Sequence, residues 1–358
     1  MSFVTRLKLK IKKNNSLFAY LYSIKYCRNY YFQKSIRAMT GEDATLLLIE
    51  GNYNLTGDIY YLIDCGSKKD DLRGFFALIR HNIKSICFAE AYGLVPCVIW
   101  GKGCIYHDRR MDHVTQNVFE YYYEPISLHY DEVLDKHRYV RMRDADNLRI
   151  PDQMIKEQTY VVDDHELEKL AEIYGRYFHL NKKTQSYIDS GIQAIMQEGD
   201  KIIGVHVRGT DFKNQFNNHP EFCGFIPFVD AAKQMMEEGD YNKIFLATED
   251  NEVIDLFNEE FDDKVIYYQD CIRGRGKTSV VLDKRGYGYG MGLEVLRDVY
   301  TLAQCDSFLY GLSQVAFAVR YIKESRNEQF SQIRQIEMRV NKNRNDDRSY
   351  YQKLKNHG

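Results

Sequence analysis

The chain has 358 residues, of which 44% are hydrophobic and 28% are charged, as in an ordinary folded soluble protein. A single hydrophobic core rarely extends over a chain of this length, so two domains are expected. The formal net charge of −2 provides no basic excess for binding a nucleic-acid backbone, so we expect no nucleic-acid partner. No segment approaches the roughly 20 consecutive apolar residues that a membrane-spanning helix needs.

Residues 1–40 form a basic N-terminal segment that we predict to be helical, with an uninterrupted basic and apolar run at 6–13. We interpret it as a surface helix with a solvated basic side. The alternative is a peripheral contact with an anionic membrane surface at the inner face of the membrane. The segment lacks the long apolar run and the small-residue cleavage site of a secretory signal.

Eight cysteines are present, and no C-x-x-C spacing occurs among them. Cys87, Cys97 and Cys305 lie within apolar runs, which is typical of small buried side chains in a reducing compartment. We therefore expect a cytoplasmic protein without disulfide bonds and without a metal site.

The first half of the chain predicts one α/β unit. Residues 59–63 form a short apolar strand, and 94–100 form a second one. Between them, apolar residues recur at helical spacing from 74 to 91, and Gly93 is expected to stop this helix.

A highly charged helical segment is predicted over 163–198, with Asp163 or Asp164 capping its start. We place the domain boundary near 185–200. The resulting division is an acceptor-side α/β domain at 41–190, a Rossmann-like domain at 191–340 and a charged tail at 341–358.

Strands and helices alternate throughout the second half. The predicted strands are 202–207, 243–248, 265–268 and 307–310, and the predicted helices are 227–238, 251–261, 292–305 and 314–323. This alternation indicates a doubly wound parallel sheet with helices on both faces. Ligands of such sheets bind at the carboxyl ends of the strands.

The end of the first of these strands carries the strongest candidate residues. His206 and Arg208 point to one face of the strand, and the guanidinium of Arg208 suits phosphate oxygens. Gly209 lets a ligand approach the backbone closely. The alternative is a plain ion pair between Arg208 and Asp211, and the sequence alone leaves the two interpretations level.

Two further strand ends carry polar residues. Glu249 and Asp250 are both candidates to line the same crevice, although sequence position alone favours a helix cap for Asp250. Asp298 lies in the middle of a predicted helix, where a carboxylate could accept hydrogen bonds from a guanine base, or could simply face solvent. Ser313 and Gln314 open the last helix, whose free N–H groups favour a phosphate.

Three motif-like stretches are interpreted as coincidental. Residues 273–278 resemble part of a P-loop, but Cys271 stands where the motif requires glycine. We expect this basic stretch, up to Gly292, to be a mobile loop over the site. Residues 144–146 form an accidental D-x-D, and the glycine-rich run 286–290 lacks the helix-opening context of a dinucleotide fingerprint.

Three segments together resemble the signatures of the fucosyltransferase superfamily, which includes α1,2-, α1,6- and protein O-fucosyltransferases. They are residues 204–211, 247–250 and 298–315, in the correct order along the chain. Residues 76–100 and 117–125 also resemble bacterial members, so the similarity extends over residues 60–325. It implies a GT-B-like fold of two Rossmann-like domains, with donor GDP-fucose on the second. It also implies inverting, metal-independent transfer to a hydroxyl of a glycan acceptor.

The resemblance also implies roles for individual residues. Arg208 would clamp the β-phosphate and stabilise the charge on departing GDP. His206 and Asp298 would hold the guanosine, while Ser313 and Gln314 would hold phosphate or sugar. Acceptor binding would fall to the first domain, near Gly66, Gly74 and Phe75.

The chain departs from the superfamily pattern at two places. Many members carry a second arginine where this chain has Gly209. The glutamate base of the α1,6 enzymes is replaced here by residues 215–217, which leaves Asp211 or Glu221 to take the acceptor proton. The sequence thus predicts a glycosyltransferase that uses GDP-fucose. The alternatives are the same fold with another nucleotide-sugar, or a GDP-sugar-binding module without catalysis.

Overall fold

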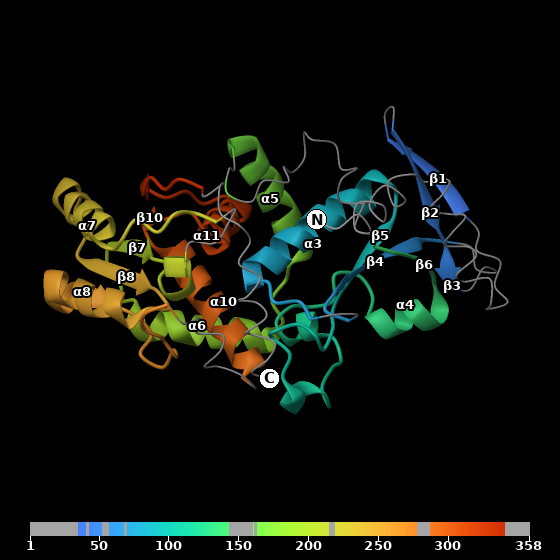
Figure 1. Cartoon of the computed structure of the whole chain (residues 1–358), viewed down its shortest axis with the longest axis horizontal. Coiled ribbons are helices and arrows are strands. Elements are labelled where there is room, and N and C mark those ends of the chain that lie inside the picture. Colours follow the sequence, from blue (N-terminus) through green and yellow to red (C-terminus); the bar gives the residue numbers. More distant parts are fainter. Residues whose placement is uncertain are drawn as a thin grey trace.

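The computed structural model describes residues 35–40, 43–51, 57–67, 70–142, 160, 163–214, 219–277 and 287–340. The two larger β-sheets lie toward opposite ends of the long axis of the molecule, and α3, α5, α10 and α11 lie between them (Figure 1). The α/β class predicted from the sequence is confirmed.

The first half holds a four-stranded mixed sheet in the order β3-β6-β4-β5. Its elements are β3 (Glu50–Gly51), β4 (Ile59–Cys65), α3 (Phe75–Ala91), β5 (Val95–Trp100), α4 (Tyr130–Lys136) and β6 (Arg138–Arg141). The predicted strand-helix-strand unit is confirmed, and Gly93 follows the helix with a left-handed φ of 65°. The sequence interpretation missed α4 and the short strands β3 and β6.

The second half holds a five-stranded, entirely parallel sheet in the order β11-β10-β7-β8-β9. Its strands are β7 (Ile202–His206), β8 (Lys243–Ala247), β9 (Val265–Ile266), β10 (Ser307–Tyr310) and β11 (Gln332–Gln335). Its helices are α7 (Ile226–Glu238), α8 (Asn251–Phe261), α10 (Gly288–Gln304) and α11 (Gln314–Ser325). The predicted parallel sheet is confirmed, with β11 as an additional strand.

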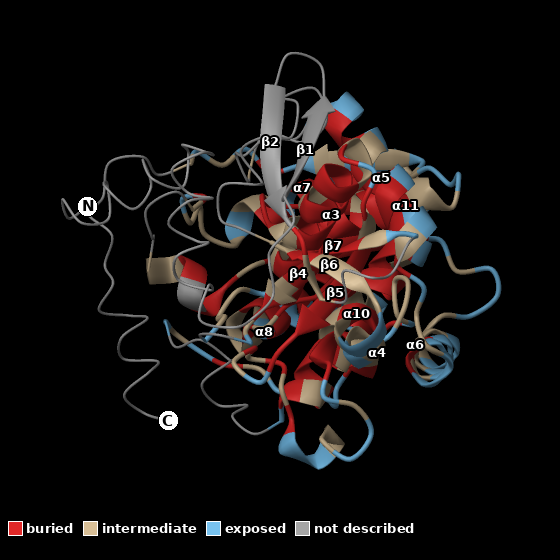
Figure 2. Ribbon diagram, turned by 90° about the vertical axis from the view of Figure 1, so that its right-hand side faces the viewer, coloured by how far each residue is buried: buried red, intermediate tan, exposed pale blue. Residues whose placement is uncertain are grey.

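Alternate residues of these strands enter two different cores, which shows that the sheet is covered on both faces. Ile203 and Val205 of β7 pack with α7 and α8. Phe308 and Tyr310 of β10 belong to the larger core on the other face, with α10 and α11. Figure 2 shows that buried residues gather around the sheets at the centre of the view. Successive side chains of a strand point to opposite faces of the sheet, so each strand contributes to both cores. The doubly wound arrangement predicted from the alternation of elements is therefore confirmed.

The charged helical segment predicted over 163–198 is two helices, and the prediction of one continuous segment was wrong. Asp163 caps α5 (Asp164–Tyr177) by accepting from the N–H of Glu166. Asn181 caps α6 (Lys182–Ile195) in the same manner. Between the helices, the ring of Phe178 turns inward and stacks on Tyr174, with their centroids 5.2 Å apart. Tertiary packing therefore overrides the local helical pattern at this point.

One continuous hydrophobic core joins the two halves of the molecule. It includes Ile63 and Trp100 from the first sheet as well as Val299 and Phe308 from the second half. Helix α5 packs against both α3 and α11. Arg80 of α3 and Glu166 of α5 form a buried ion pair in this region. The halves are therefore packed against each other through helices and not only connected in sequence.

Helix α10 begins at Gly288, four residues earlier than predicted. The glycine-rich run therefore does open a helix, and residues 288–292 are part of that helix and not of a mobile loop. A Cβ on Gly288 would lie 2.5 Å from the carbonyl oxygen of His107, and a Cβ on Gly292 would lie 2.3 Å from the ring of Tyr122. The Tyr122 hydroxyl donates to the carbonyl oxygens of Gly288 and Tyr289, each 3.1 Å away. The glycines let α10 approach the first half closely.

Several sequence interpretations concern residues outside the described parts of the chain. These include residues 1–34, the D-x-D at 144–146, residues 278–286 and the tail 341–358. Residues 35–40, which we predicted as the end of a helical segment, instead form strand β1 (Ser35–Thr40), paired with β2 (Asp43–Leu48). Within the described ranges, no helix is both long and apolar enough to cross a membrane.

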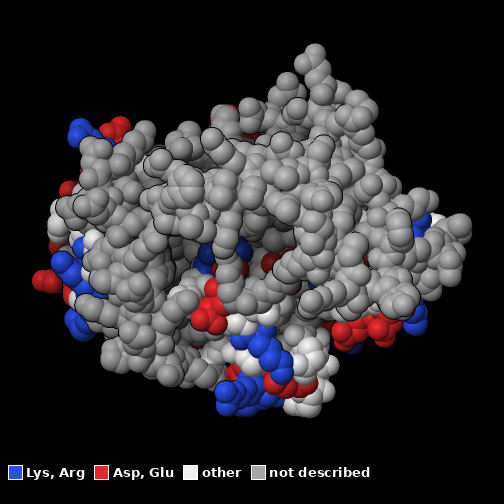
Figure 3. All heavy atoms as spheres, turned by 45° about the vertical axis from the view of Figure 1, so that its right-hand side comes forward, with Lys and Arg blue, Asp and Glu red and all other residues white. Residues whose placement is uncertain are grey.

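The side chains of Cys87, Cys97 and Cys305 are buried, as predicted, and their thiols are free. The charged side chains that can be seen in Figure 3 include both signs close together along the lower edge of that face. No His, Cys, Asp and Glu cluster suited to a metal ion occurs among the residues that the structure describes.

Candidate functional site

The order of the strands locates the site. β7 comes first in the chain and lies at the centre of the second sheet, with β8 and β9 on one side and β10 and β11 on the other. The direction of the chain through the sheet thus reverses between β7 and β10. His206 at the end of β7 is paired in register with Tyr310 at the end of β10. The carboxyl ends of strands at such a switch point are where α/β sheets bind ligands.

His206 is almost completely buried at this switch point, with 4% of its surface exposed. Burial, with a smaller contribution from the Arg208 charge, lowers the pKa of His206 to about 3. Its ring is therefore neutral at physiological pH. Its Nδ1 lies 3.4 Å from the Oγ of Ser313. A neutral imidazole here can exchange hydrogen bonds with a ligand without adding charge.

Arg208 follows β7 and keeps 30% of its side chain exposed. Its guanidinium lies over the ring of Phe212, 4.9 Å from the centroid, and its Nη1 lies 3.5 Å from Oε1 of Glu249. Burial raises the pKa of Tyr106 in the first half of the chain, and the positive charge of Arg208 opposes that rise. The guanidinium of Arg208 thus lies close enough to Tyr106, in the first half of the chain, to affect the pKa of its hydroxyl. The side chain of Asp211, the alternative ion-pair partner, lies outside the described parts.

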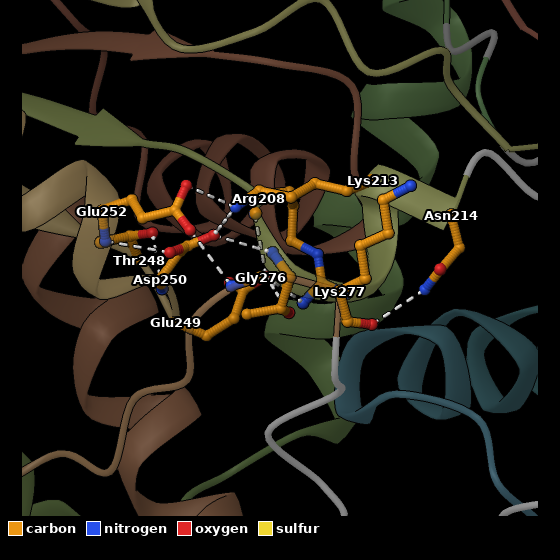
Figure 4. Close-up of polar contacts among 11 residues, drawn as sticks. Arg208, Lys213, Asn214, Thr248, Glu249, Asp250, Glu252, Gly276 and Lys277 are labelled. Carbon is orange, nitrogen blue, oxygen red and sulfur yellow. Dashed lines mark hydrogen bonds and ion pairs between the residues drawn. The ribbon is translucent and has the colours of Figure 1, made fainter.

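The carboxylate of Glu249 accepts hydrogen bonds from the loop after β7 (Figure 4). Its Oε1 accepts from the N–H of Gly209 at 3.0 Å and from the hydroxyl of Thr210 at 3.3 Å, in addition to the Arg208 contact. Three donors from consecutive residues therefore converge on one carboxylate oxygen. This donor set also suits an oxygen of a phosphate group.

Asp250 has a structural role, as its sequence position suggested. Its side chain is fully buried and caps α8 by accepting from the N–H of Glu252 at 3.0 Å. The other carboxylate oxygen accepts from the N–H of Thr210 at 3.1 Å and lies 2.7 Å from Nζ of Lys213. Asp250 therefore ties the loop after β7 to the start of α8.

The close approach of Asp250 also explains the glycine at position 209. A Cβ on Gly209 would lie 2.4 Å from Oδ2 of Asp250, which is much closer than such atoms come in proteins. A second arginine at this position does not fit this backbone. The next residue, Thr210, is 1% exposed and has a φ of 29°, a conformation that a β-branched residue rarely adopts. Strain of this kind is concentrated at functional sites.

The loop over 271–277 supports the site from the side of β8. The N–H of Gly274 donates to the carbonyl oxygen of Glu249 at 2.9 Å, and Nε of Arg273 donates to that of Thr248 at 3.1 Å. The N–H of Gly276 reaches Oε1 of Glu252 at 3.2 Å. Sequence reasoning missed the supporting roles of Lys213 and Arg273. Arg273 lies in the P-loop-like run that was set aside, and no local signal indicates either contact.

The remaining predicted donor-site residues lie on α10 and α11. Ser313 caps α11 by accepting from the N–H of Ala316 at 3.0 Å, and Gln314 is the first residue of that helix. Asp298 is half-buried on α10 and near Tyr268 and Cys271. Burial raises the pKa of both of these groups, that of Cys271 to about 12, and the Asp298 charge adds to the rise. The structure thus brings His206 and Ser313 together, and it places Asp298 near Tyr268 and Cys271.

The predicted acceptor-side and proton-accepting residues are more dispersed. Glu221 is exposed, and its N–H donates to the carbonyl oxygen of Arg339 at 2.7 Å. Phe75 is only 2% exposed and packs edge-on against Trp100, which makes it a core residue. Gly74 caps α3, and Gly66 adopts a left-handed φ of 81°.

Comparisons with known proteins were made by sequence and by structure. No family model matches the chain, and no curated protein matches it by sequence. Among solved structures, the chain is similar to the NodZ α-1,6-fucosyltransferase soaked with GDP-fucose, with 15% identity over 74% of this chain and 93% of that one, at a TM-score of 0.45. It is also similar to NodZ from Bradyrhizobium, with 16% identity over 75% and 93% of the two chains and a TM-score of 0.43. POFUT1 in its apo form shows 9% identity over 79% and 99%, at 0.45.

Proposed function

We propose that this chain is a glycosyltransferase that transfers fucose from GDP-fucose to a hydroxyl group of a glycan acceptor. The observation that carries the proposal is the donor cluster after β7, where the Arg208 guanidinium, the Gly209 N–H and the Thr210 hydroxyl converge on one anionic oxygen. This cluster lies at the end of the central strand, where such sheets bind nucleotides. The three sequence segments that resemble fucosyltransferase signatures support the choice of donor.

In the proposed reaction, Arg208 binds the β-phosphate of the donor. Negative charge grows on this phosphate as the bond to the sugar breaks, so a fixed cation stabilises the transition state more than the bound donor. The N-terminus of α11, capped by Ser313, provides N–H groups for the same diphosphate. His206 and Asp298 would hold the guanosine. The proposed transfer is inverting and requires no metal ion.

The acceptor hydroxyl must lose a proton as it attacks the sugar. We assign this proton to Asp211 in preference to Glu221. Asp211 lies three residues after Arg208, in the short 3-10 helix Thr210–Asn214 at the site. Glu221 is exposed, and its backbone is paired with that of Arg339.

Substitution of Arg208 by alanine tests the proposed site. Arg208→Ala should lower the rate of GDP release from GDP-fucose in the presence of acceptor glycans by about a hundredfold or more, because a charge-assisted contact to the leaving group is lost. GDP-mannose, assayed in parallel, tests the choice of donor. Arg334→Ala is a matched control, because Arg334 lies on the edge strand β11 and pairs with Glu238 of α7. Its removal should leave turnover unchanged. Near-normal turnover by Arg208→Ala would rule out the assignment.

A GDP-sugar-binding module without catalysis is the second candidate. It is favoured by the exposed position of Glu221, whose backbone is paired with that of Arg339. Titration calorimetry that shows GDP binding, combined with no release of GDP in the presence of a broad glycan panel, would favour this module over the enzyme.

A further inference from the structure

Glu249 and Asp250 are adjacent carboxylates, but their environments differ. Asp250 is fully buried, and its oxygens are engaged by the cap of α8, by Thr210 and by Lys213. The side chain of Glu249 is 19% exposed, and that of its partner Arg208 is 30% exposed. The Glu249–Arg208 pair is therefore reachable from solvent, whereas Asp250 is fixed in the fold.

The donors around Glu249 form a cradle for an anion. Within this cradle the Gly209 N–H and the Thr210 hydroxyl lie 3.0 and 3.3 Å from Oε1, and the guanidinium nitrogen lies 3.5 Å from it. A guanidinium, a backbone N–H and a hydroxyl are the groups that bind phosphoryl oxygens in proteins. The carboxylate oxygen of Glu249 thus occupies the place that a phosphoryl oxygen would take.

We propose that Glu249 is an internal competitor of the phosphate ligand. Its carboxylate fills the cradle and must withdraw before a diphosphate binds. The identification of the ligand as a nucleoside diphosphate rests on the proposed function, whereas the cradle itself would accept inorganic pyrophosphate. This role differs from that of a residue that binds the donor.

Competition of this kind lowers the apparent affinity of the site. A ligand binds only to the fraction of molecules in which the cradle is free, so its apparent Kd rises as that fraction falls. The negative charge of Glu249 also repels the entering phosphate. Replacing Glu249 by glutamine keeps the size of the side chain but removes the charge, and this change should weaken the contact that competes with the ligand for Arg208.

Titration calorimetry with inorganic pyrophosphate tests the proposal on the full chain. Glu249→Gln should bind pyrophosphate about tenfold more tightly than the wild type, a difference of about 1.4 kcal/mol. Glu252→Gln is the matched control, since this nearby carboxylate contacts Lys213 and the N–H of Gly276 instead of Arg208. It makes the same change of charge and should alter the affinity by less than about twofold.

The opposite result is expected if Glu249 serves to position Arg208. In that case Glu249→Gln would bind pyrophosphate more weakly than the wild type, or equally well, and the proposal would be overturned. Glu249→Asp provides a second variant if the first does not fold. It withdraws the carboxylate by one methylene and should also tighten binding, by a smaller factor, so a weaker affinity would likewise refute the proposal.

Failure of the proposed function would be distinguishable from failure of the competition proposal. It would appear as GDP that binds no more tightly than pyrophosphate, together with no release of GDP from GDP-fucose by the wild type. Pyrophosphate carries neither base nor sugar, so the comparison between Glu249→Gln and Glu252→Gln stays valid in that event.

Discussion

The imidazole of His206 lies at the end of a buried strand and close to a guanidinium group. Burial and the neighbouring guanidinium both disfavour a positive charge on the ring. Burial removes the water that would stabilise this charge, and the positive charge of Arg208 repels it. The result is a hydrogen-bonding group that stays neutral near Arg208. The positive charge at this strand end is therefore left to the arginine, which is directed at the proposed phosphate position.

This shift of the pKa makes the stability of the protein depend on pH. The folded-state pKa of about 3 lies below the ordinary value of 6.5, so between these values the unfolded chain binds a proton that the folded chain does not. The His206 contribution is thus complete above about pH 6.5 and is lost as the pH falls toward 3, by up to about 1.4 kcal/mol per pH unit.

Urea unfolding of the wild type and His206→Gln at pH 7.5 and pH 4.5 measures this contribution. Glutamine does not titrate, so the variant should gain stability relative to the wild type at the lower pH. An equal difference between the two proteins at both pH values would contradict the expected behaviour of His206.

At the scale of single elements, the start of α10 determines how closely the two halves approach. The helix presents Gly288 to the backbone near His107 and Gly292 to the ring of Tyr122. Glycine is unfavourable within a helix, so the local preference of these residues does not indicate one here. The space required by Tyr122 and by the backbone at His107 explains why these residues are small.

Gly292→Ala tests this packing. The added methyl would collide with the Tyr122 ring, and the resulting shifts should lower the free energy of unfolding by about 1–3 kcal/mol, as measured by urea denaturation. Gly74→Ala is a suitable control, because Gly74 has a φ of −62° and no atom lies within 4 Å of the added Cβ position. Its stability should change by less than about 1 kcal/mol. Equal losses in both variants would argue against the packing explanation.

Regular patterns in the sequence were sufficient to predict the principal strands and helices of both halves. Apolar spacing identified α3, β7 and α8, because each element buries one face or both faces against its neighbours. The position of Arg208 at a strand end followed from the same patterns. The break between α5 and α6 did not, because the charged helical pattern continues through it and only the packing of Phe178 interrupts it.

The contacts of the candidate site depend on residues far apart in the chain. The contact between Gly209 and Glu249 spans 40 positions, and it exists only because β7 and β8 are neighbours in the sheet. The sequence indicated that both residues lie at strand ends, but not that a carboxylate oxygen would occupy the cradle. The helical spacing of apolar residues included Phe75, but it could not show that its ring packs edge-on against Trp100.

At the scale of the whole molecule, the shared core should make the two halves unfold together. The hydroxyl groups of Tyr123, Tyr174 and Tyr300 form a buried chain across this core, with oxygen separations of 3.1 and 2.9 Å. Unfolding one half would expose these groups and the apolar side chains around them. A partly unfolded molecule would therefore lose much of the stabilisation of the other half.

Trp100 makes this expectation measurable, since it is the only tryptophan in the chain and is fully buried in the first sheet. Its fluorescence reports on the first half, while far-ultraviolet circular dichroism reports on helices throughout the chain. The two signals should give the same urea midpoint. A fluorescence transition at clearly lower urea would show that the first half unfolds independently.

The contact between Gly209 and Asp250 has a consequence for the history of the site. A side chain at 209 would occupy the space of the carboxylate that caps α8, so neither position is free to change alone. An arginine at 209 would require a smaller residue at 250, with a weaker start to α8, or a shifted loop. The two positions are therefore expected to be inherited as a unit, each limiting the substitutions that the other can tolerate.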